Sequence, residues 1–461
     1  MAYTAFITRL KNVRPHPNAD RLQMGECFGN TVIVSLEYED NQLGVYFPSD
    51  GQLSVAFAEV NNLLRKKDEN GNNIGGYMDP DKRNITAIKL RGEKSDGLFL
   101  PLKSLETFGD IATLHEGDRI DNFNGHEICC KYVPRSNVRH GHVSNGNKTR
   151  KKKVPVAPLF TEHADTEQLA YNLGAFKPGD EIEVTLKMHG TSQRTAYLPV
   201  FKGYKRTFWD WLFRREGTPI YDWGYVSGTR RTVLEDFEGG YYGSNEFREA
   251  HSKFFEGKLW KGEEVYYEVV GFTHTGAPIM ATADNKKLND KEFMKQYGKE
   301  TVFSYGCSLF GGQILSSQGI IDFVDPKPQS DIYVYRMTMT NEDGDVVEYT
   351  PDFMRYRCEQ MGVKTVPVMW KGIIPDISPS YAGEFIKDIA EEFYDGPDPI
   401  GKTHVREGVV VRILNRPKFC AYKHKNWSFK ALEGIVKVEA EAPDMEEADG
   451  IDEEVTTNEL S

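Results

Sequence analysis

Alternating hydrophobic and polar positions mark the first 135 residues as β-rich. Short apolar runs recur there at Ala5–Leu10, Thr31–Ser35, Leu43–Phe47, Ala87–Leu90 and Gly97–Leu100. Turn-forming residues separate these runs, for example at 15–20, 70–73 and 122–125. Short strands with turns between them are typical of a small barrel or sandwich. The pattern therefore predicts an all-β, OB-like barrel over residues 1–135.

Two stretches of this barrel resemble the tRNA-binding type of OB-fold. Residues 16–22 read His-Pro-Asn-Ala-Asp-Arg-Leu, and residues 91–101 read Arg-Gly-x-x-Ser-x-Gly-Leu-x-x-Pro. The same residue types also serve as turns and barrel-closing positions in any OB-fold. The resemblance thus favours the barrel and leaves open whether these residues recognise nucleic acid.

The pattern changes after residue 135. Residues 136–155 lack apolar periodicity and are rich in Gly, Asn, Ser and the basic residues Arg139, Lys148, Arg150, Lys151, Lys152 and Lys153. They predict a linker that is either only solvated or in contact with nucleic-acid phosphates. From 156 to 437, strand patterns alternate with helical ones such as Lys291–Tyr297 and Tyr381–Phe393. This mixture predicts a single α+β domain.

An insertion at about 200–222 interleaves basic and aromatic side chains: Lys202, Lys205, Arg206, Trp209, Trp211, Arg214 and Arg215. Such a mixture suits single-stranded or nicked nucleic acid, because bases stack on rings and phosphates pair with cations. An ordinary amphipathic surface helix is the alternative, and the pattern slightly favours it.

The net charge of −12 is concentrated at the end of the chain. Residues 438–461 hold ten acidic residues and no Lys or Arg. We predict a solvated, disordered acidic tail there. The rest of the chain is nearly neutral, so local basic patches can dominate its surface.

Composition excludes several classes of protein. No run approaches the ~18 apolar residues that span a bilayer, and the first residues lack the pattern of a signal peptide. The six cysteines show neither CxxC nor zinc-ligand spacing. We expect a monomeric cytoplasmic protein with free thiols and no membrane contact.

Residues 180–188 alternate strictly and predict a strand. Its apolar face holds Ile182, Val184, Leu186 and Met188, and its polar face holds Glu181, Glu183, Thr185 and Lys187. The strand ends at His189 and Gly190, where glycine permits a tight turn. Lys187 is thus expected at a strand end, facing away from the apolar layer, which suits a nucleophile above a pocket.

The segment 187–192, Lys-Met-His-Gly-Thr-Ser, resembles motif I of the covalent nucleotidyltransferases, which include RNA ligases, DNA ligases and mRNA capping enzymes. The histidine at position 189 resembles the RNA ligase branch of this family. DNA ligases and capping enzymes usually carry Asp at that position. The resemblance implies an ATP-grasp-like ligase adenylation domain in which Lys187 forms lysyl-AMP. It also implies that Leu186, Met188, His189 and Gly190 contact the nucleotide.

Three more segments resemble family motifs in the family's order. Residues 226–231 are similar to motif Ia, whose arginine helps to hold the 5′-phosphate; Arg230 and Arg231 both fit. Residues 266–271 are similar to motif III and imply that Glu268 contacts the ribose. Residues 332–335 match motif IIIa more weakly, with Tyr335 favoured over Tyr333 as the ring that stacks on adenine.

Two final segments resemble motifs IV and V. Residues 406–412, Arg-Glu-Gly-Val-Val-Val-Arg, imply that Glu407 binds a metal ion through water. Residues 422–425, followed by Phe429, place Lys423 and Lys425 beside the nucleotide. On a strand, residues two apart share a face, so both amines can lie along a triphosphate.

The chemistry explains these residue types. A lysine amine attacks phosphorus only when neutral, and its ordinary pKa is ~10.4. Neighbouring cations favour the neutral amine, and they also stabilise charge that develops during phosphoryl transfer. A carboxylate on an apolar strand is costly to bury unless it meets a cation or metal-bound water. Mg²⁺ or Mn²⁺ suits such oxygen ligands.

Domain order narrows the resemblance. The OB domain follows the catalytic domain in DNA ligases and capping enzymes, whereas here it would precede it, as in Deinococcus-type RNA ligases. Those enzymes seal 3′-OH/5′-phosphate nicks through an RNA-adenylate (AppRNA). The implied function is ATP-dependent RNA repair on nicked RNA or an RNA/DNA hybrid duplex. A GTP-using capping enzyme and a non-catalytic RNA-binding protein with a decayed ligase fold are the alternatives.

Overall fold

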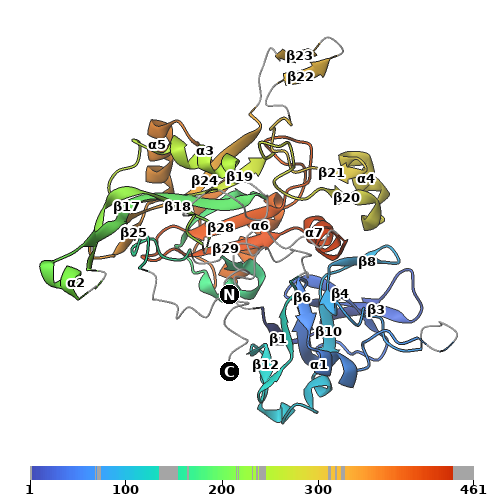
Figure 1. Ribbon diagram of the computed structural model, residues 1–461. Helices are drawn as coiled ribbons and strands as arrows, with labels where there is room; N and C mark the ends of the chain where they lie inside the picture. The colour runs from blue at the N-terminus through green and yellow to red at the C-terminus, as the bar shows by residue number, and fades with distance from the viewer. Residues whose placement is uncertain are drawn as a thin grey trace.

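The computed structural model describes residues 3–133 and 154–439, apart from 68, 70–73, 164–165, 214, 216, 231, 235–236, 238–244, 310–312, 317–318 and 323–327. Most of the predicted linker and acidic tail therefore lies outside the described residues. The described residues are mostly β-sheet with few helices (Figure 1).

The N-terminal part is β-rich, as the alternating pattern predicts. Its main sheets have the strand orders β10-β5-β1-β11, β2-β3-β4 and β14-β6-β7. The elements are β1 (Ala5–Arg9), β2 (Lys11–Pro15), β3 (Leu22–Cys27), β4 (Asn30–Ser35), β5 (Leu43–Phe47), β6 (Gly51–Leu53), α1 (Val55–Val60), β7 (Asn84–Ile85), β8 (Ile88–Leu90), β9 (Glu93–Ser95), β10 (Leu98–Pro101), β11 (Arg119–Ile120), β12 (Asn122–Phe123), β13 (His126–Glu127) and β14 (Cys129–Lys131).

The two OB-like sequence stretches meet in space. The His16 ring nitrogen Nε2 lies 3.2 Å from the carbonyl oxygen of Leu90, and the Asn18 side chain donates to the Arg91 carbonyl at 3.0 Å. The turn between the strands of the second stretch puts Arg91 at φ 48°. The contact between Asn18 and Arg91 joins the two stretches directly.

The second part of the chain contains two larger sheets, with the orders β15-β29-β28-β16-β27 and β18-β17-β19-β24-β25. The strands are β15 (Glu167–Gln168), β16 (Glu181–Lys187), β17 (Thr191–Lys205), β18 (Thr218–Gly228), β19 (Glu263–Gly271), β20 (Ala283–Asp284), β21 (Glu300–Thr301), β22 (Gln313–Ser316), β23 (Gly319–Asp322), β24 (Ser330–Thr340), β25 (Val346–Glu348), β26 (Lys364–Thr365), β27 (Val368–Ile373), β28 (Gly408–Ile413) and β29 (Ala421–Lys425). The helices are α2 (Phe208–Leu212), α3 (Glu246–Phe254), α4 (Lys291–Tyr297), α5 (Pro351–Met361), α6 (Ala382–Phe393) and α7 (Trp427–Glu439).

Two apolar cores support these sheets. One joins the C-terminal end of β16 to β19, β24, α3 and α5, and the other packs α6 against β16 and β28. Ile182 and Val184 belong to the second core, and Leu186 and Met188 to the first. The strand that carries Lys187 is therefore held in both cores along its whole length.

Helix α7 joins the two parts of the chain (Figure 1). Lys430 forms an ion pair with Asp96 at 2.6 Å, and the Trp427 indole donates to the Ser95 carbonyl at 3.3 Å. A second ion pair, Lys89 to Asp290, spans the parts at 2.8 Å. The N-terminal sheets are thus fixed against the C-terminal helix.

The slight preference for an amphipathic helix at about 200–222 was wrong. Strands β17 and β18 instead form a long hairpin, and α2 caps its tip. The large side chains of α2 are all exposed, so this helix has no buried face; Arg214 lies outside the described residues.

Two expectations from composition can be compared with the structure. All six cysteines are free thiols. Within the described ranges, no helix is long and apolar enough to cross a membrane.

Candidate active site

Strand β16 brings Lys187 to the centre of the site. Its apolar face is buried as predicted, with exposures of 0–3% from Ile182 to Met188. The opposite face does not point into open solvent: Glu183 on that face is also buried, and its carboxylate accepts from Arg355 at 2.8 Å. Glu183, Thr185 and Lys187 on this second face line a cavity, whereas Glu181 at the start of the strand is exposed.

Strand register places three charged side chains together. Lys187 pairs with Gly408 across β16 and β28, and Gly408 pairs with Lys425 across β28 and β29. Glu407, which precedes Gly408, is 2% exposed, and its Oε1 lies 2.8 Å from Lys187 Nζ and 3.2 Å from Lys425 Nζ. Gly408 has φ 151°, and a Cβ there would lie 2.0 Å from the His424 carbonyl oxygen. Glycine at position 408 therefore permits β28 to pack closely between β16 and β29.

His189 is buried beside this cluster. Its backbone N–H donates to the Tyr305 hydroxyl at 2.6 Å, and its ring lies edge-on to Phe303 and Phe429 at 4.6 and 4.7 Å. Burial lowers the pKa of His189 to about 4, although the neighbouring Glu407 carboxylate opposes that shift. The imidazole is thus neutral at physiological pH and helps to shape the floor of the site.

Gly190 allows β19 to approach the end of β16. A Cβ at this position would lie 2.6 Å from the Val269 carbonyl oxygen and 3.1 Å from Glu268 Oε2. Glu268 itself pairs with Ser192 in the neighbouring strand. Burial raises the pKa of Glu268 to about 8, while the charge of Lys187 acts against the rise.

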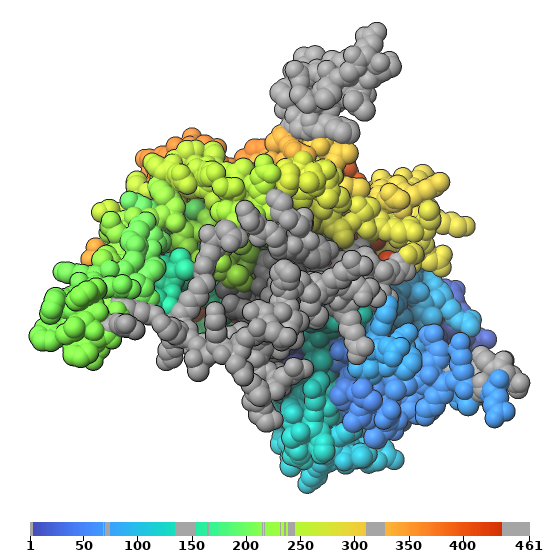
Figure 2. Space-filling model, viewed as in Figure 1, coloured from blue at the N-terminus to red at the C-terminus, as the bar shows by residue number. Residues whose placement is uncertain are grey.

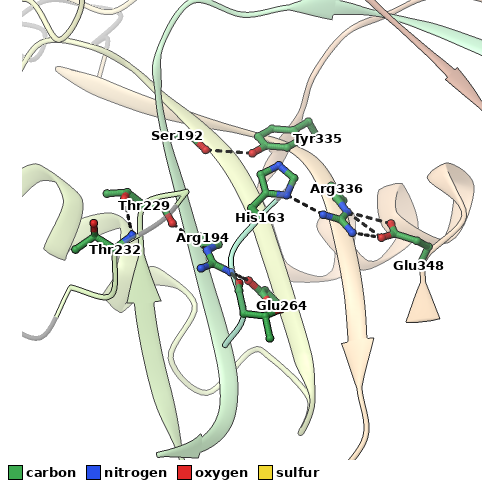
Figure 3. A network of polar contacts seen from close by, with 10 residues as sticks. His163, Ser192, Arg194, Thr229, Thr232, Glu264, Tyr335, Arg336 and Glu348 are labelled. Atoms are coloured by element: carbon green, nitrogen blue, oxygen red, sulfur yellow. Dashed lines mark hydrogen bonds and ion pairs between the residues drawn. The ribbon is translucent and has the colours of Figure 1, made fainter. Parts of the chain in front are cut away.

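A β-bulge distinguishes the two candidate tyrosines. Tyr266 pairs with Arg336 and Tyr267 with Val334, so Tyr335 is the extra residue on β24. Bulges re-aim side chains and are frequent beside active sites. The Tyr335 hydroxyl contacts Ser192 Oγ (Figure 3), with 3.1 Å between the two oxygens. Tyr335 also lines the cavity. Tyr333 lies in the apolar core instead.

All of the predicted site residues surround two adjoining cavities. The inner cavity is lined by Leu186, Glu268 and Tyr335, and the outer cleft by His189, Gly190, Glu407 and Lys425. Four predicted residues line both: Lys187, Met188, Arg230 and Lys423. The second arginine candidate, Arg231, lies outside the described residues. Lys187 thus stands where the two cavities meet.

The N-terminal part contributes to the outer cleft. Thr86, Arg119 and Lys131 line it together with Lys425. None of these residues was predicted from the sequence, because nothing in their local sequence distinguishes them from other surface positions.

Several residues of the site have no local sequence signal. Glu183 and Arg355, for example, line the inner cavity. Arg412 lines it too and donates to the Tyr349 carbonyl at 3.2 Å, but it belongs to the segment that resembles motif IV. The buried Arg248 donates to the Ser192 carbonyl at 3.1 Å and to Thr191 Oγ1 at 2.5 Å, which fixes the start of β17. A second polar network joins Arg336 to Glu348 and to His163 below Tyr335 (Figure 3).

Two buried carboxylate oxygens test whether a nucleotide and a metal ion fit. Glu268 Oε2 and Glu407 Oε2 have no hydrogen-bond partner among the described residues. A buried acceptor without a donor is costly, by ~1–3 kcal/mol. A sugar hydroxyl could donate a hydrogen bond to Glu268 Oε2. A water held by a hard cation could donate one to Glu407 Oε2. The described residues contain no cluster of three His, Cys, Asp or Glu side chains that could hold a metal ion.

Searches with the sequence find neither a matching family model nor a matching curated protein. Solved structures do match the fold. A single-residue mutant of Naegleria gruberi RNA ligase with ATP and Mn aligns at 16% identity and TM-score 0.51, over 92% of this chain and 98% of that one. Another mutant of that ligase, with AMP and Mn, gives the same identity and TM-score over 92% and 97%.

The chain has the fold of an RNA ligase. The likeness extends over nearly the full length of both proteins, so it includes the N-terminal sheets as well as the two large ones. At 16% sequence identity, this likeness shows the fold alone. The chemistry of this RNA ligase fold has to be argued from the residues around Lys187.

Proposed function

We propose that this protein is an ATP-dependent RNA ligase that joins 3′-OH and 5′-phosphate ends through an adenylate on Lys187. The observation that carries the proposal is the position of the Lys187 amine. It lies at the junction of two cavities, 2.8 Å from the buried Glu407 carboxylate and near Lys425. The inner cavity then holds the nucleotide and the outer cleft holds the RNA ends.

In the first step, the Lys187 amine attacks the α-phosphate of ATP. A P–N bond forms, the bond to pyrophosphate breaks, and the amine loses a proton. Tyr335 would stack on adenine, and the unpartnered Glu268 oxygen would accept from the ribose. Lys423 and Lys425 project from one strand, so their charges can stabilise the departing pyrophosphate.

In the second and third steps, the outer cleft receives the RNA ends. AMP passes from Lys187 to the 5′-phosphate, which gives the RNA-adenylate, and the P–N bond breaks. The 3′-OH then attacks the same phosphate and AMP leaves. Arg119, Lys131 and Arg230 line this cleft and suit phosphate contacts.

Mg²⁺ or Mn²⁺ would supply positive charge to the phosphate oxygens, and Glu407 would hold it through water. The solved Naegleria ligase structures with ATP and Mn support this choice of cofactors for the present chain. The free thiols fit a reducing compartment such as the cytoplasm.

We also propose the finer assignments of domain and substrate. The N-terminal unit, 1–135, is an OB-type barrel that docks the RNA duplex, and 156–437 is the adenylation domain. The chain acts as a monomer on nicks whose 3′-OH strand is RNA, as in the Deinococcus type, in RNA repair. The position of Arg119 and Lys131 at the outer cleft supports the docking role.

The proposal is tested with [α-³²P]ATP and a panel of substrates. The wild-type chain should acquire label from ATP but not from GTP, and Lys187→Ala should acquire none. It should then seal nicked RNA duplexes and RNA-to-DNA junctions with an RNA 3′-OH, but not nicked DNA. Label from GTP would indicate a capping enzyme, and absence of any adduct would indicate a non-catalytic RNA-binding protein.

A further inference from the structure

The β17–β18 hairpin carries an aromatic tip far from the active site. In Figure 1 it extends to the left from the body, with α2 at its end, and Figure 2 shows the same segment as a protrusion. The tip exposes Phe208, Trp209, Trp211, Leu212 and Phe213 by 49–68% of their surfaces. These five apolar side chains occur within six residues, and we call them the aromatic tip.

The aromatic tip is an ordered structure. Thr207 and Asp210 form a reciprocal capping box at the start of α2. Strand pairing continues to Lys205 and Thr218 at the base of the tip. Exposed clusters of large apolar side chains are disfavoured in water and usually mark a binding surface. A partner that covers these rings would remove that cost.

Cations surround the aromatic tip. Lys202, Lys205 and Arg206 precede it, and the guanidinium of Arg215 lies 5.5 Å from the Phe213 ring centroid. Asp210 is the acidic residue within α2, and its carboxylate accepts from the backbone and hydroxyl of Thr207. The flanks therefore suit a polyanion, and the rings suit flat, apolar faces.

Nucleotides with unpaired bases match both properties. Aromatic side chains of such platforms stack on bases, while Lys and Arg contact the phosphates. In a duplex, the base faces are already stacked on one another, so single strands are the form that rings can bind. A membrane surface would also attract basic and aromatic side chains, but interfacial helices carry a strongly charged face opposite their apolar one. Helix α2 has five residues, of which four are large and apolar and the fifth is Asp210.

We propose that the aromatic tip binds unpaired RNA that flanks the ends to be joined, an inference that rests on the proposed ligase function. Strand β17 starts at Thr191, directly after Gly190 of the site, and its 15 residues end at the tip. At ~3.3 Å per residue, the strand spans roughly 45 Å. That length corresponds to about 13 nucleotides of a stacked strand at ~3.4 Å each. The tip therefore contacts RNA well beyond the ends themselves.

The test measures the dissociation constant of the full-length protein for nicked RNA duplexes with and without a 20-nucleotide single-stranded extension. Trp209→Ala/Trp211→Ala should weaken binding of the extended substrate at least tenfold and leave binding of the blunt one unchanged. Trp209→Phe/Trp211→Phe should keep the affinity, because it keeps the rings. Trp209→Leu/Trp211→Leu should lose it, although it keeps apolar surface.

Tyr356→Ala, which removes an exposed aromatic ring from α5, is the matched control and should bind as the wild type does. Labelling of Lys187 by ATP, measured in parallel, should be equal in all these variants, so failure of ligase chemistry is scored separately from failure of RNA binding. Equal affinities of the wild type and the Ala variant for the extended RNA would overturn the proposal. So would retention of affinity in the Leu variant. Tip-dependent binding to phosphatidylserine vesicles, with RNA affinity unchanged, would assign the tip to a membrane instead.

Discussion

Oε1 of Glu407 accepts from two amines at once, Lys187 Nζ at 2.8 Å and Lys425 Nζ at 3.2 Å. One buried carboxylate thus holds both cations, and its second oxygen has no hydrogen-bond partner among the described residues. If Glu407 held a metal ion through water, its carboxylate would hold Lys187 less tightly, and the amine would be available to attack a phosphate. In our account, Glu407 therefore links nucleophile, metal and phosphate charges.

Glu407→Gln should abolish most adenylation. The amide is nearly isosteric but uncharged, so it leaves Lys187 and Lys425 without their shared counter-charge. We expect lysyl-AMP formation to fall at least 100-fold, in the range seen for single groups that stabilise charge in a transition state. Glu433→Gln is the control, since Glu433 contacts Lys425 at 2.9 Å and is not predicted to bind metal. Rapid-quench labelling measures both, and a loss below threefold for Glu407→Gln would contradict the account.

Tyr335→Leu should weaken ATP binding, and Tyr335→Phe should not. Leucine removes the ring that stacks on adenine, whereas phenylalanine loses only the contact with Ser192. We expect the KM for ATP to rise about tenfold in the leucine variant, because base–ring stacking is worth ~1–3 kcal/mol. Tyr333→Leu should lower the Tm without raising KM, since Tyr333 lies in the core. The reverse pattern would assign stacking to Tyr333.

Glu268→Gln should stabilise the protein more at high pH than at low pH. The pKa of Glu268 is about 8 in the fold because the side chain is buried, against ~4.3 in an unfolded chain. Between these values the folded state binds more protons, so its stability falls as pH rises through the window. Glutamine removes this effect. The gain in Tm should therefore be small near pH 4.5 and largest above pH 8, whereas exposed Glu359→Gln should give no pH-dependent gain. Equal gains at both pH values would exclude Glu268 as the titrating group.

Gly190→Ala should impair both folding and adenylation. The added methyl would lie 2.6 Å from the Val269 carbonyl oxygen, so β19 and Glu268 must shift. We expect ~1–3 kcal/mol of destabilisation and a reduced rate of lysyl-AMP formation. Gly174→Ala is the matched control, because nothing lies within 4 Å of its Cβ. Urea unfolding measures the free energy, and equal values for both variants would refute the close approach.

The sequence predicted the site well where its signals are local. Alternation placed Lys187 at a strand end, and spacing placed Lys423 and Lys425 on one strand; both features are present. Tyr333 and Tyr335 share the same strand parity, so alternation could not separate them. The bulge in β24 does so, and its position depends on the register with β19.

Long-range contacts account for most of what the sequence could not predict. Glu183 and Arg355 are far apart in the chain, yet they form an ion pair in which the Glu183 side chain on the polar face of β16 is 3% exposed. The pairing of Asp96 with Lys430 likewise spans the chain and turns an OB-like sequence stretch into an interface. Ring and charge spacing at 200–222 slightly favour an amphipathic helix over a nucleic-acid-binding segment, because spacing alone does not reveal that a hairpin carries these side chains away from the apolar cores.

The most direct test of the account is to locate AMP on the protein by tandem mass spectrometry after incubation with ATP and Mg²⁺. We predict one AMP per chain, on the side-chain amine of Lys187. The AMP should be released when pyrophosphate or nicked RNA is added. AMP on another residue, or an adduct that persists in Lys187→Ala, would contradict the central claim.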